Sequence, residues 1–265
     1  MKVKSLITIT NPDLFDNCTL MFRTLRVGFP TAEIEVTDNA TIDPTHRRRI
    51  RELCAASNVD YSYSSHRLHH AEWICNSIEL GQGKLIIVDP DTMFWKSCEG
   101  PEFDFPTHIA GYHVPVIYNE FARCVSFERL HTSFLVVKDC EALVDATQQL
   151  YQPACAEGGE YCPFDPYMPC VKAVRGKYMF WDSCANLYNM VGGTHFTETQ
   201  LECYDHLNSA SFYDIMLSRV DDPTSFEHQH KVAKTNPESL RGFYKAVDNY
   251  YKRMNEKAIA MEKAL

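Results

Sequence analysis

The 265-residue sequence lacks several features that would assign it to a familiar class of protein. No stretch approaches the roughly 18 consecutive apolar residues of a membrane-spanning helix, and the apolar stretch at the N-terminus is too short for a secretory signal. The 11 cysteines contain no pair separated by two residues, so neither a zinc site nor a regular disulfide framework is indicated. No internal repeat or low-complexity linker divides the chain. We therefore expect a soluble cytoplasmic protein, in the host cytoplasm if it is viral, with reduced thiols.

Positive charge is also scarce. The chain has 26 lysines and arginines against 35 aspartates and glutamates, which gives a formal net charge of −9. This balance opposes a general attraction to nucleic acid or to anionic membranes. The exception is the basic segment HRRRIRE at 46–52, so DNA stays a possible partner that we do not favour.

What the first third of the chain does contain is a regular alternation of strand-like and helix-like segments. Runs rich in β-branched and apolar residues predict strands at 3–10, 32–39, 59–65 and 84–89. Apolar residues at helical spacing predict helices at 14–29, 44–57 and 69–81, the second of them beginning near Asp43 and Pro44. This alternation predicts an α/β fold, with a mainly parallel central sheet and helices on both faces.

The rest of the chain is less regular. We expect a strand at 131–139, a helix at 140–151, a loop at 153–170, a short helix at 165–174 and a strand at 177–182. A long C-terminal helix is predicted from Asn236, its cap, with Pro237 at its first position. We expect a single domain over 1–235, with halves 1–95 and 96–235, followed by the helix at 236–265.

Two aspartates, Asp89 and Asp91, directly follow the fourth predicted strand. Ligands of open α/β sheets bind outside the carboxyl ends of the strands, so the position suits a binding site. Two carboxylates one residue apart repel each other unless a hard divalent cation with oxygen ligands lies between them. Such a cation would neutralise a diphosphate and help it to leave. A plain Asp-Pro-Asp turn is the alternative explanation, and the position after a strand favours the cation.

The segment LIIVDPDTMFW, which follows three strand–helix units, resembles the D-x-D motif of glycosyltransferases with the GT-A fold. The resemblance covers about residues 1–215 in the order of elements, and D-x-D is its one sharp motif. It implies a Rossmann-like GT-A fold and a glycosyltransferase that uses a nucleotide-sugar donor, most simply a UDP-sugar. It also implies Mn²⁺ or Mg²⁺ held by Asp89 and Asp91. The half at 1–95 would bind the donor, and the half at 96–235 would face the acceptor.

The resemblance implies further site residues. Donor contacts would come from the ends of the first two strands and from the third helix, namely Thr8, Thr10, Asn11, Asp38, Asn39 and Asn76. Trp73, on the same helix, is expected in the core instead. On the acceptor side, His131, Thr132 and Ser133 stand where the family often has a pattern of small residues.

Many metal-dependent members of this family complete the metal site with a histidine far downstream. We expect His206 in that role, with His195 as its rival and His228 and His230 as further alternatives. For each of them a packed or surface imidazole is the other explanation. Asp165, in a Gly- and Pro-rich loop, would take a proton from the acceptor or bind sugar hydroxyls, unless it is only a helix cap.

Three other functions fit part of the pattern. A phosphatase of the haloacid dehalogenase type also follows a strand with D-x-D, but Met93 stands where that family has Thr or Val, and the motif here is on the fourth strand. A sugar nucleotidyltransferase would carry a Gly-rich loop after its first strand, and TITNPDLF at 8–15 has no glycine. The third alternative is a catalytically silent nucleotide-sugar-binding module. The acceptor is open among a saccharide, a protein, a small molecule and a hydroxylated DNA base.

Overall fold

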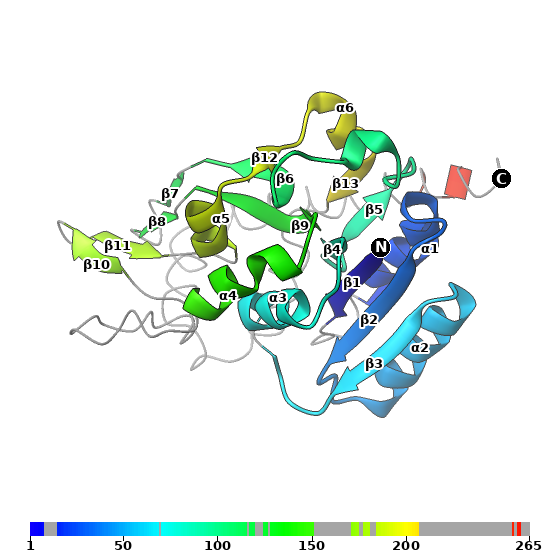
Figure 1. Cartoon of the computed structure of the whole chain (residues 1–265). Coiled ribbons are helices and arrows are strands. Elements are labelled where there is room, and N and C mark those ends of the chain that lie inside the picture. Colours follow the sequence, from blue (N-terminus) through cyan, green and yellow to red (C-terminus); the bar gives the residue numbers. More distant parts are fainter. Residues whose placement is uncertain are drawn as a thin grey trace, which may run out of the picture.

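A seven-stranded sheet forms the centre of the protein (Figure 1). The computed structural model describes residues 1–7, 15–68, 70–115, 117–119, 124–126, 128–150, 171–174, 177–180, 184–206, 256 and 259–260. The strand order is β12-β6-β9-β4-β1-β2-β3. Their bounds are Lys2–Ile7 for β1, Glu33–Asn39 for β2, Asp60–Ser64 for β3, Leu85–Val88 for β4, Ile109–Val114 for β6, Arg129–Val137 for β9 and Thr194–His195 for β12.

The sheet is mainly parallel, as the alternation of strands and helices predicts. β1 pairs in parallel with β2 and β4, β2 with β3, and β6 with β12. β9 is antiparallel to both of its neighbours, β4 and β6. Because β9 and β6 follow residue 96 and yet extend the sheet begun by β1 to β4, the two predicted halves of the chain share one sheet.

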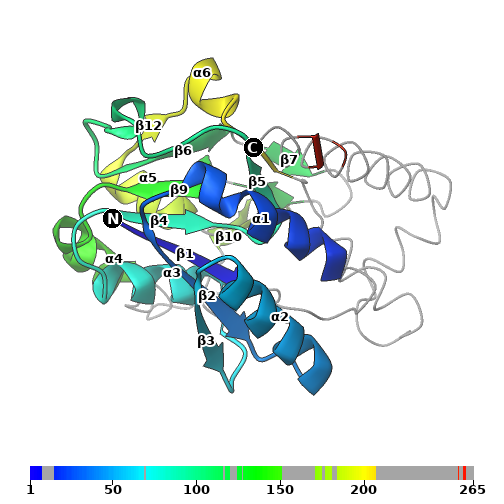
Figure 2. The same cartoon turned by 90° about the vertical axis from the view of Figure 1, so that its right-hand side faces the viewer.

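Helices cover both faces of the sheet, which confirms the predicted fold class. α1 (Phe15–Gly28) and α2 (Pro44–Ala56) lie on one face, while α3 (His70–Glu79), α4 (Val144–Leu150) and α5 (Ala185–Val191) lie on the other (Figures 1 and 2). Strand β4 has apolar side chains on both faces of the sheet, so both faces need a layer of helices. Ile86 and Val88 join the core under α1 and α2, and Leu85 and Ile87 join the core under α3. A strand buried on both sides reads as a continuous apolar run.

The sequence signals that start and end elements act as expected in the first third of the chain. The carboxylate of Asp43 caps α2 by accepting hydrogen bonds from the backbone N–H groups of Thr45 and His46, and Pro44 is the first helical residue. The predicted helix at 140–151 is a short 3₁₀ turn, Glu141–Leu143, that continues as α4. The C-terminal helix expected at 236–265 lies outside the described residues, apart from Glu256, Ile259 and Ala260, which are helical.

The helix predicted at 165–174 is wrong over its second part. Residues 171–174 form strand β10 (Val171–Val174), which pairs antiparallel with β11 (Lys177–Phe180), and 165–170 lie outside the described residues. The two valines favour an extended chain, and the pairing with β11 supplies the backbone hydrogen bonds that a helix would have made. These strands belong to a smaller sheet with β8 (Cys124–Ser126) and β7 (Ile117–Asn119).

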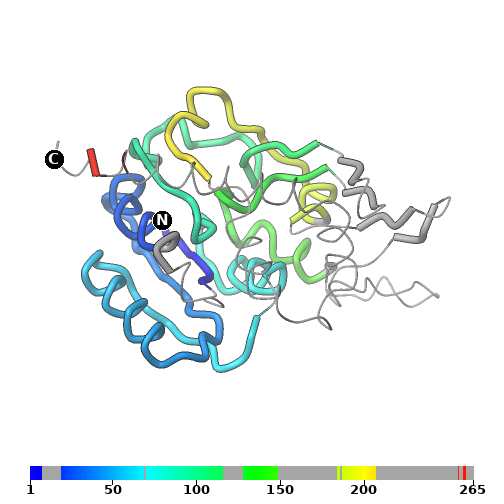
Figure 3. The backbone as a smooth tube through the Cα atoms, turned by 180° about the vertical axis from the view of Figure 1, so that it is seen from behind, coloured from blue at the N-terminus to red at the C-terminus, as the bar shows by residue number. Residues whose placement is uncertain are grey.

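Two very short strands complete the part of the fold that matters for function. β5 (Thr92–Phe94) follows β4 directly, and β13 (Tyr204–His206) pairs with it after the short helix α6 (Glu198–Leu201). Viewed from behind, the yellow segment that ends in β13 returns alongside the blue-green segment that holds β5 (Figure 3). None of the described helices is both long and apolar enough to cross a membrane.

Candidate functional site

Asp89 and Asp91 lie in a tight connection between β4 and β5. The N–H of Thr92 donates to the carbonyl of Asp89 at 3.1 Å, so an Asp-Pro-Asp turn is present, as the alternative explanation of the motif requires. The turn is also tied to strand β9. The carbonyl of Ser133 accepts from the N–H of Asp89 at 3.1 Å and from Oγ1 of Thr92 at 2.9 Å. These hydrogen bonds hold the backbone that carries both carboxylates in place.

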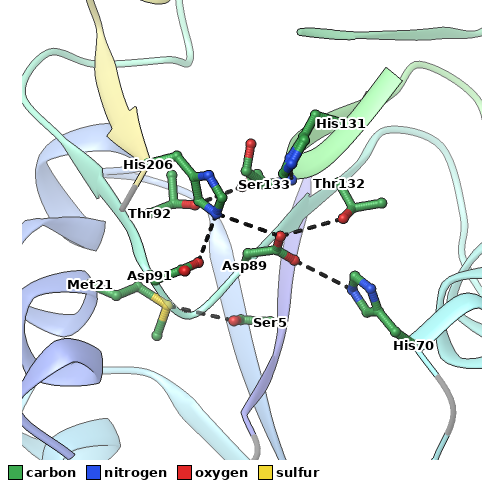
Figure 4. Close-up of polar contacts among 10 residues, drawn as sticks. All are labelled: Ser5, Met21, His70, Asp89, Asp91, Thr92, His131, Thr132, Ser133 and His206. Atoms are coloured by element: carbon green, nitrogen blue, oxygen red, sulfur yellow. Dashed lines mark hydrogen bonds and ion pairs between the residues drawn. The ribbon is translucent and has the colours of Figure 1, made fainter. Parts of the chain in front are cut away.

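A register irregularity in β9 helps to bring that strand to the turn. Gly111 and His113 of β6 are two positions apart, but their partners in β9, Leu135 and Leu130, are five positions apart. The extra residues in β9, from His131 onward, leave the regular ladder with β6, as bulged residues do. This segment lies beside Asp89 (Figure 4).

His206 reaches the aspartates through strand β13. In the antiparallel pairing with β5, His206 is opposite Thr92, the residue after Asp91. Its Nε2 lies 2.9 Å from Oδ1 of Asp91 and 3.9 Å from Oδ2 of Asp89 (Figure 4). A hydrogen bond of 2.5 Å from Nε1 of Trp95 to Oδ2 of Asp205 joins the same two segments. The structure thus places the expected histidine against both expected carboxylates.

The local electrostatics suit a cation. Burial of Asp91 disfavours its charged form, but the combined effects of His206, a backbone hydrogen bond and the nearby His131 outweigh burial, so the pKa of the Asp91 carboxyl lies below its usual value. Oδ1 of Asp91 is buried, and its contact at 2.9 Å with Nε2 of His206 falls outside the geometry of a hydrogen bond, with no other partner for this oxygen among the described residues. Two carboxylates and one imidazole are donors that Mn²⁺ and Mg²⁺ accept, and a cation would satisfy this buried oxygen. The donor set therefore fits the metal that the motif implies.

Three further side chains surround Asp89. Its Oδ2 accepts a hydrogen bond from Oγ1 of Thr132 at 3.4 Å, and its Oδ1 lies 3.4 Å from Nε2 of His70, at the start of α3. The potential ligand atoms of Asp89, His131 and His206 lie within 4.8 Å of one another. The sequence pattern predicts no role for His70, and His131 stands out in it only as a departure from the family pattern. The signal that was available is the position of His131 in the strand that pairs with β4.

His131 differs from His206 in its hydrogen bonding. Its Nδ1 accepts a hydrogen bond from the N–H of Ser133 at 3.0 Å. A neutral imidazole that accepts at Nδ1 carries its hydrogen on Nε2 and is a donor there. His131 is consequently suited to bind an anion, and His206 is the better candidate for a metal ligand.

The other expected donor contacts have varied surroundings. Asp38 is fully buried, and its carboxylate accepts from the N–H of Thr41 and from the hydroxyl of Tyr61. The side-chain amide of Asn39 hydrogen bonds with the backbone of Leu68 in both directions. Asn76 is half-buried on α3. Donor binding by these residues stays a prediction.

Trp73 is buried in the core under α3, as expected. The remaining expected site residues lie outside the described part of the chain: Thr8, Thr10, Asn11, Asp165, His228 and His230.

The rival histidine, His195, is in a different place. It lies in β12 with its ring stacked on that of His113, and the two ring centroids are 4.0 Å apart. Burial and the nearby His113 lower the pKa of His195. It belongs to a second group of polar side chains rather than to the group around Asp91.

No protein-family model matches the sequence, and no curated protein matches it significantly. Several solved structures are similar at low identity. The bifunctional glycosyltransferase WbbM is 12% identical, with a TM-score of 0.44 over 83% of this chain and 44% of that chain. The glycosyltransferase GlyE from Streptococcus pneumoniae is 10% identical, with a TM-score of 0.45 over 83% and 51% of the two chains. The mannosyltransferase PcManGT from Pyrobaculum calidifontis, in complex with GDP-Man and Mn²⁺, is 10% identical, with a TM-score of 0.36 over 98% and 85%. The chain spans about half the length of the first two.

Proposed function

We propose that the chain is a metal-dependent glycosyltransferase that moves a sugar from a nucleotide-diphosphate sugar to an acceptor hydroxyl. The donor that we favour is a UDP-sugar. The observation that carries the proposal is the convergence of Asp89, Asp91 and His206 at the carboxyl edge of a mainly parallel sheet. This edge is where open α/β sheets bind ligands. A turn without a ligand site would not need a distant histidine beside a buried carboxylate.

The side chains of the site would have separate roles. Asp89, Asp91 and His206 would hold Mn²⁺ or Mg²⁺, which when bound supplies positive charge to neutralise the diphosphate leaving group. His131 would donate a hydrogen bond from Nε2 to a phosphate oxygen, because its Nδ1 is occupied by Ser133. His70 and Thr132 would orient the carboxylate of Asp89, as outer contacts do at metal sites. Asp165 is proposed as the acceptor-side base.

The first experiment measures release of the nucleoside diphosphate from UDP-, GDP- and CMP-sugars, with a panel of acceptors. Turnover should disappear with EDTA and return with Mn²⁺ or Mg²⁺. Asp89→Asn should lower turnover by about 100-fold or more, since even outer-shell changes at metal sites cost about 10- to 100-fold. Asp104→Asn is the matched control, because the side chain of Asp104 is 70% exposed and pairs only with a surface lysine among the contacts described. Full turnover in chelator would contradict the metal role.

Calorimetric titrations with Mn²⁺ and with UDP can distinguish the proposed roles of His206 and His131. His206→Ala should weaken Mn²⁺ binding both with and without UDP, because a metal ligand is lost. His131→Ala should leave Mn²⁺ binding without nucleotide nearly unchanged and should weaken UDP binding in the presence of Mn²⁺. Equal effects of the two substitutions on Mn²⁺ alone would show that both histidines are ligands. A protein that binds the donor and never turns it over with any acceptor or with water would be a silent binding module.

A further inference from the structure

A second group of ligand-type side chains lies at the same edge of the sheet, formed by His113, Glu128 and His195. His113 is near the carboxyl end of β6, Glu128 immediately precedes β9, and His195 ends β12 (Figure 1). Because β9 separates β6 from β4, this group is two strand spacings, about 10 Å, to the side of the D-x-D turn. The potential ligand atoms of the three residues lie within 4.8 Å of one another.

The fold brings these residues together from three separate segments. His113 is opposite Leu130 in β9, so Glu128, two residues earlier, is its diagonal neighbour. His195 pairs with Gly111 in β6, two residues before His113. Side chains two residues apart in a strand lie on the same face, which places the two histidine rings side by side.

The turn before His195 is built for this approach. Gly192 ends α5 with a φ of +67°, in the left-handed region that favours glycine. At Gly193, an added Cβ would come within 2.9 Å of Cδ1 of Leu130. The Gly-Gly pair therefore allows β12 to lie close against the sheet with His195 beside His113.

The three side chains are held by specific contacts. Nε2 of His113 lies 2.7 Å from Oε1 of Glu128, and the rings of His113 and His195 are parallel to within 9°. The hydroxyl of Tyr188 is 2.8 Å from Nε2 of His195 and donates to Oε1 of Glu128 at 3.5 Å. The side-chain amide of Asn189 donates to the carbonyl of Glu128 at 3.1 Å. Outer contacts of this kind orient the ligands of metal sites.

We propose that His113, Glu128 and His195 form a binding site for a transition-metal dication of the Zn²⁺ class, separate from the site around Asp89 and Asp91. Two imidazoles and one carboxylate are a donor set that Zn²⁺ uses with a water in the fourth position. Ligand atoms around tetrahedral Zn²⁺ are about 3.4 Å apart. On binding, Nε2 of His113 and Oε1 of Glu128, now 2.7 Å apart, would separate slightly, and the two stacked imidazole rings would turn so that both point at the ion. The bound ion ties β12 to β6 and to the start of β9.

The test uses the full chain, stripped of metals with a chelator, and Co²⁺ as a spectroscopic probe for Zn²⁺. Four-coordinate Co²⁺ with nitrogen ligands absorbs visible light strongly, whereas six-coordinate Co²⁺ at an oxygen-rich site absorbs weakly. We expect one strong set of visible bands that Zn²⁺ abolishes by displacement. Zn²⁺ should also raise the melting temperature.

The variants locate the site. Glu128→Gln, which keeps the shape of the side chain, and His195→Ala should each remove the strong bands, and Tyr188→Phe should weaken Zn²⁺ binding about tenfold. His66→Ala, at an exposed histidine, should bind like the unmodified chain. Asp89→Asn should keep the strong Co²⁺ bands of the histidine group and lose the weakly absorbing Co²⁺ site at the D-x-D turn. Each proposal can therefore be contradicted without affecting the other. Absence of strong bands from the unmodified chain, or their survival in both Glu128→Gln and His195→Ala, would overturn the inference and leave an ordinary His–Glu ion pair.

Discussion

The two polar groups at the carboxyl edge of the sheet differ in donor atoms and in burial. Around Asp89 and Asp91 the donors are mostly carboxylate oxygens, and the side chains are between 5% and 16% exposed. Around His113 the donors are mostly imidazole nitrogens, and the side chains of His113 and Glu128 are 30% and 43% exposed. Oxygen ligands suit Mn²⁺ and Mg²⁺, and imidazoles suit Zn²⁺. The two proposals therefore place sites with different metal preferences next to each other at one edge of the sheet.

The two groups also differ in what supports them. Behind the aspartates, Phe94 of β5, Phe134 of β9 and Tyr204 of β13 pack ring against ring, with centroids 5.0 to 6.2 Å apart. The three strands that carry the site are therefore joined through an aromatic core. The histidine group is supported mainly by hydrogen bonds from Tyr188 and Asn189 on α5. We therefore expect the aspartate site to depend strongly on core packing and the histidine group to depend on it only weakly.

The largest expected effect is that of Phe134→Ala on stability. Phe134 is fully buried and contacts the rings of Phe94, Phe196 and Tyr204, so its truncation should lower the free energy of unfolding by about 3–5 kcal/mol. Urea unfolding monitored by circular dichroism measures the change. Mn²⁺ binding should weaken as well, because β5, β9 and β13 lose their common contact. A loss below about 1 kcal/mol would break the proposed dependence of the aspartate site on packing.

A medium effect is expected at the contact between α1 and β5. A Cβ on Gly28 would lie 2.6 Å from Cγ of Phe94, while Oγ1 of Thr24 accepts from the N–H of Phe94 and holds β5 in place. Gly28→Ala should therefore destabilise the protein by about 1–3 kcal/mol through overpacking. The double variant Gly28→Ala with Phe94→Leu should lose less than the sum of the two single changes. Additive losses in urea unfolding would show that the clash is relieved elsewhere.

The smallest expected effect is that of Glu128→Gln on the metal-free protein. The His113–Glu128 pair is partly exposed, and such ion pairs contribute about 0–1 kcal/mol. Urea unfolding in chelator should detect little change, and the difference from the unmodified chain should grow when Zn²⁺ is added. A loss of more than about 2 kcal/mol in the free energy of unfolding without metal would mean that the Glu128 carboxylate itself stabilises the fold. The histidine group would then depend on the fold as strongly as the aspartate site does.

Much of the first third of the fold follows from local sequence signals. The strands and helices up to β4 have their own apolar periodicity and caps, such as Asp43 before Pro44, and the structure places them within a few residues of their predicted bounds. β5 and β13 were missed because three residues are too few to show a period. They form only because the segments pair with each other across a long stretch of chain.

The candidate site divides in the same way. Asp89 and Asp91 follow from a local motif, and His206 from the resemblance to a family. The approach of His131 to Asp89 depends on the register irregularity of β9, and the approach of His70 depends on how α3 packs. Long-range register and helix packing leave no short-range mark in the sequence, so these two histidines emerge only from the folded chain.

Strand β9 connects the two polar groups physically. Glu128 immediately precedes it, and His131 to Ser133 lie a few residues further along the same backbone. A cation that shifts the start of this strand would move the carbonyl of Ser133, which holds the D-x-D turn. Coupling between two binding sites is reciprocal in free energy. If Zn²⁺ changes the affinity for Mn²⁺ by some factor, Mn²⁺ must change the affinity for Zn²⁺ by the same factor. Strand β9 would transmit this coupling.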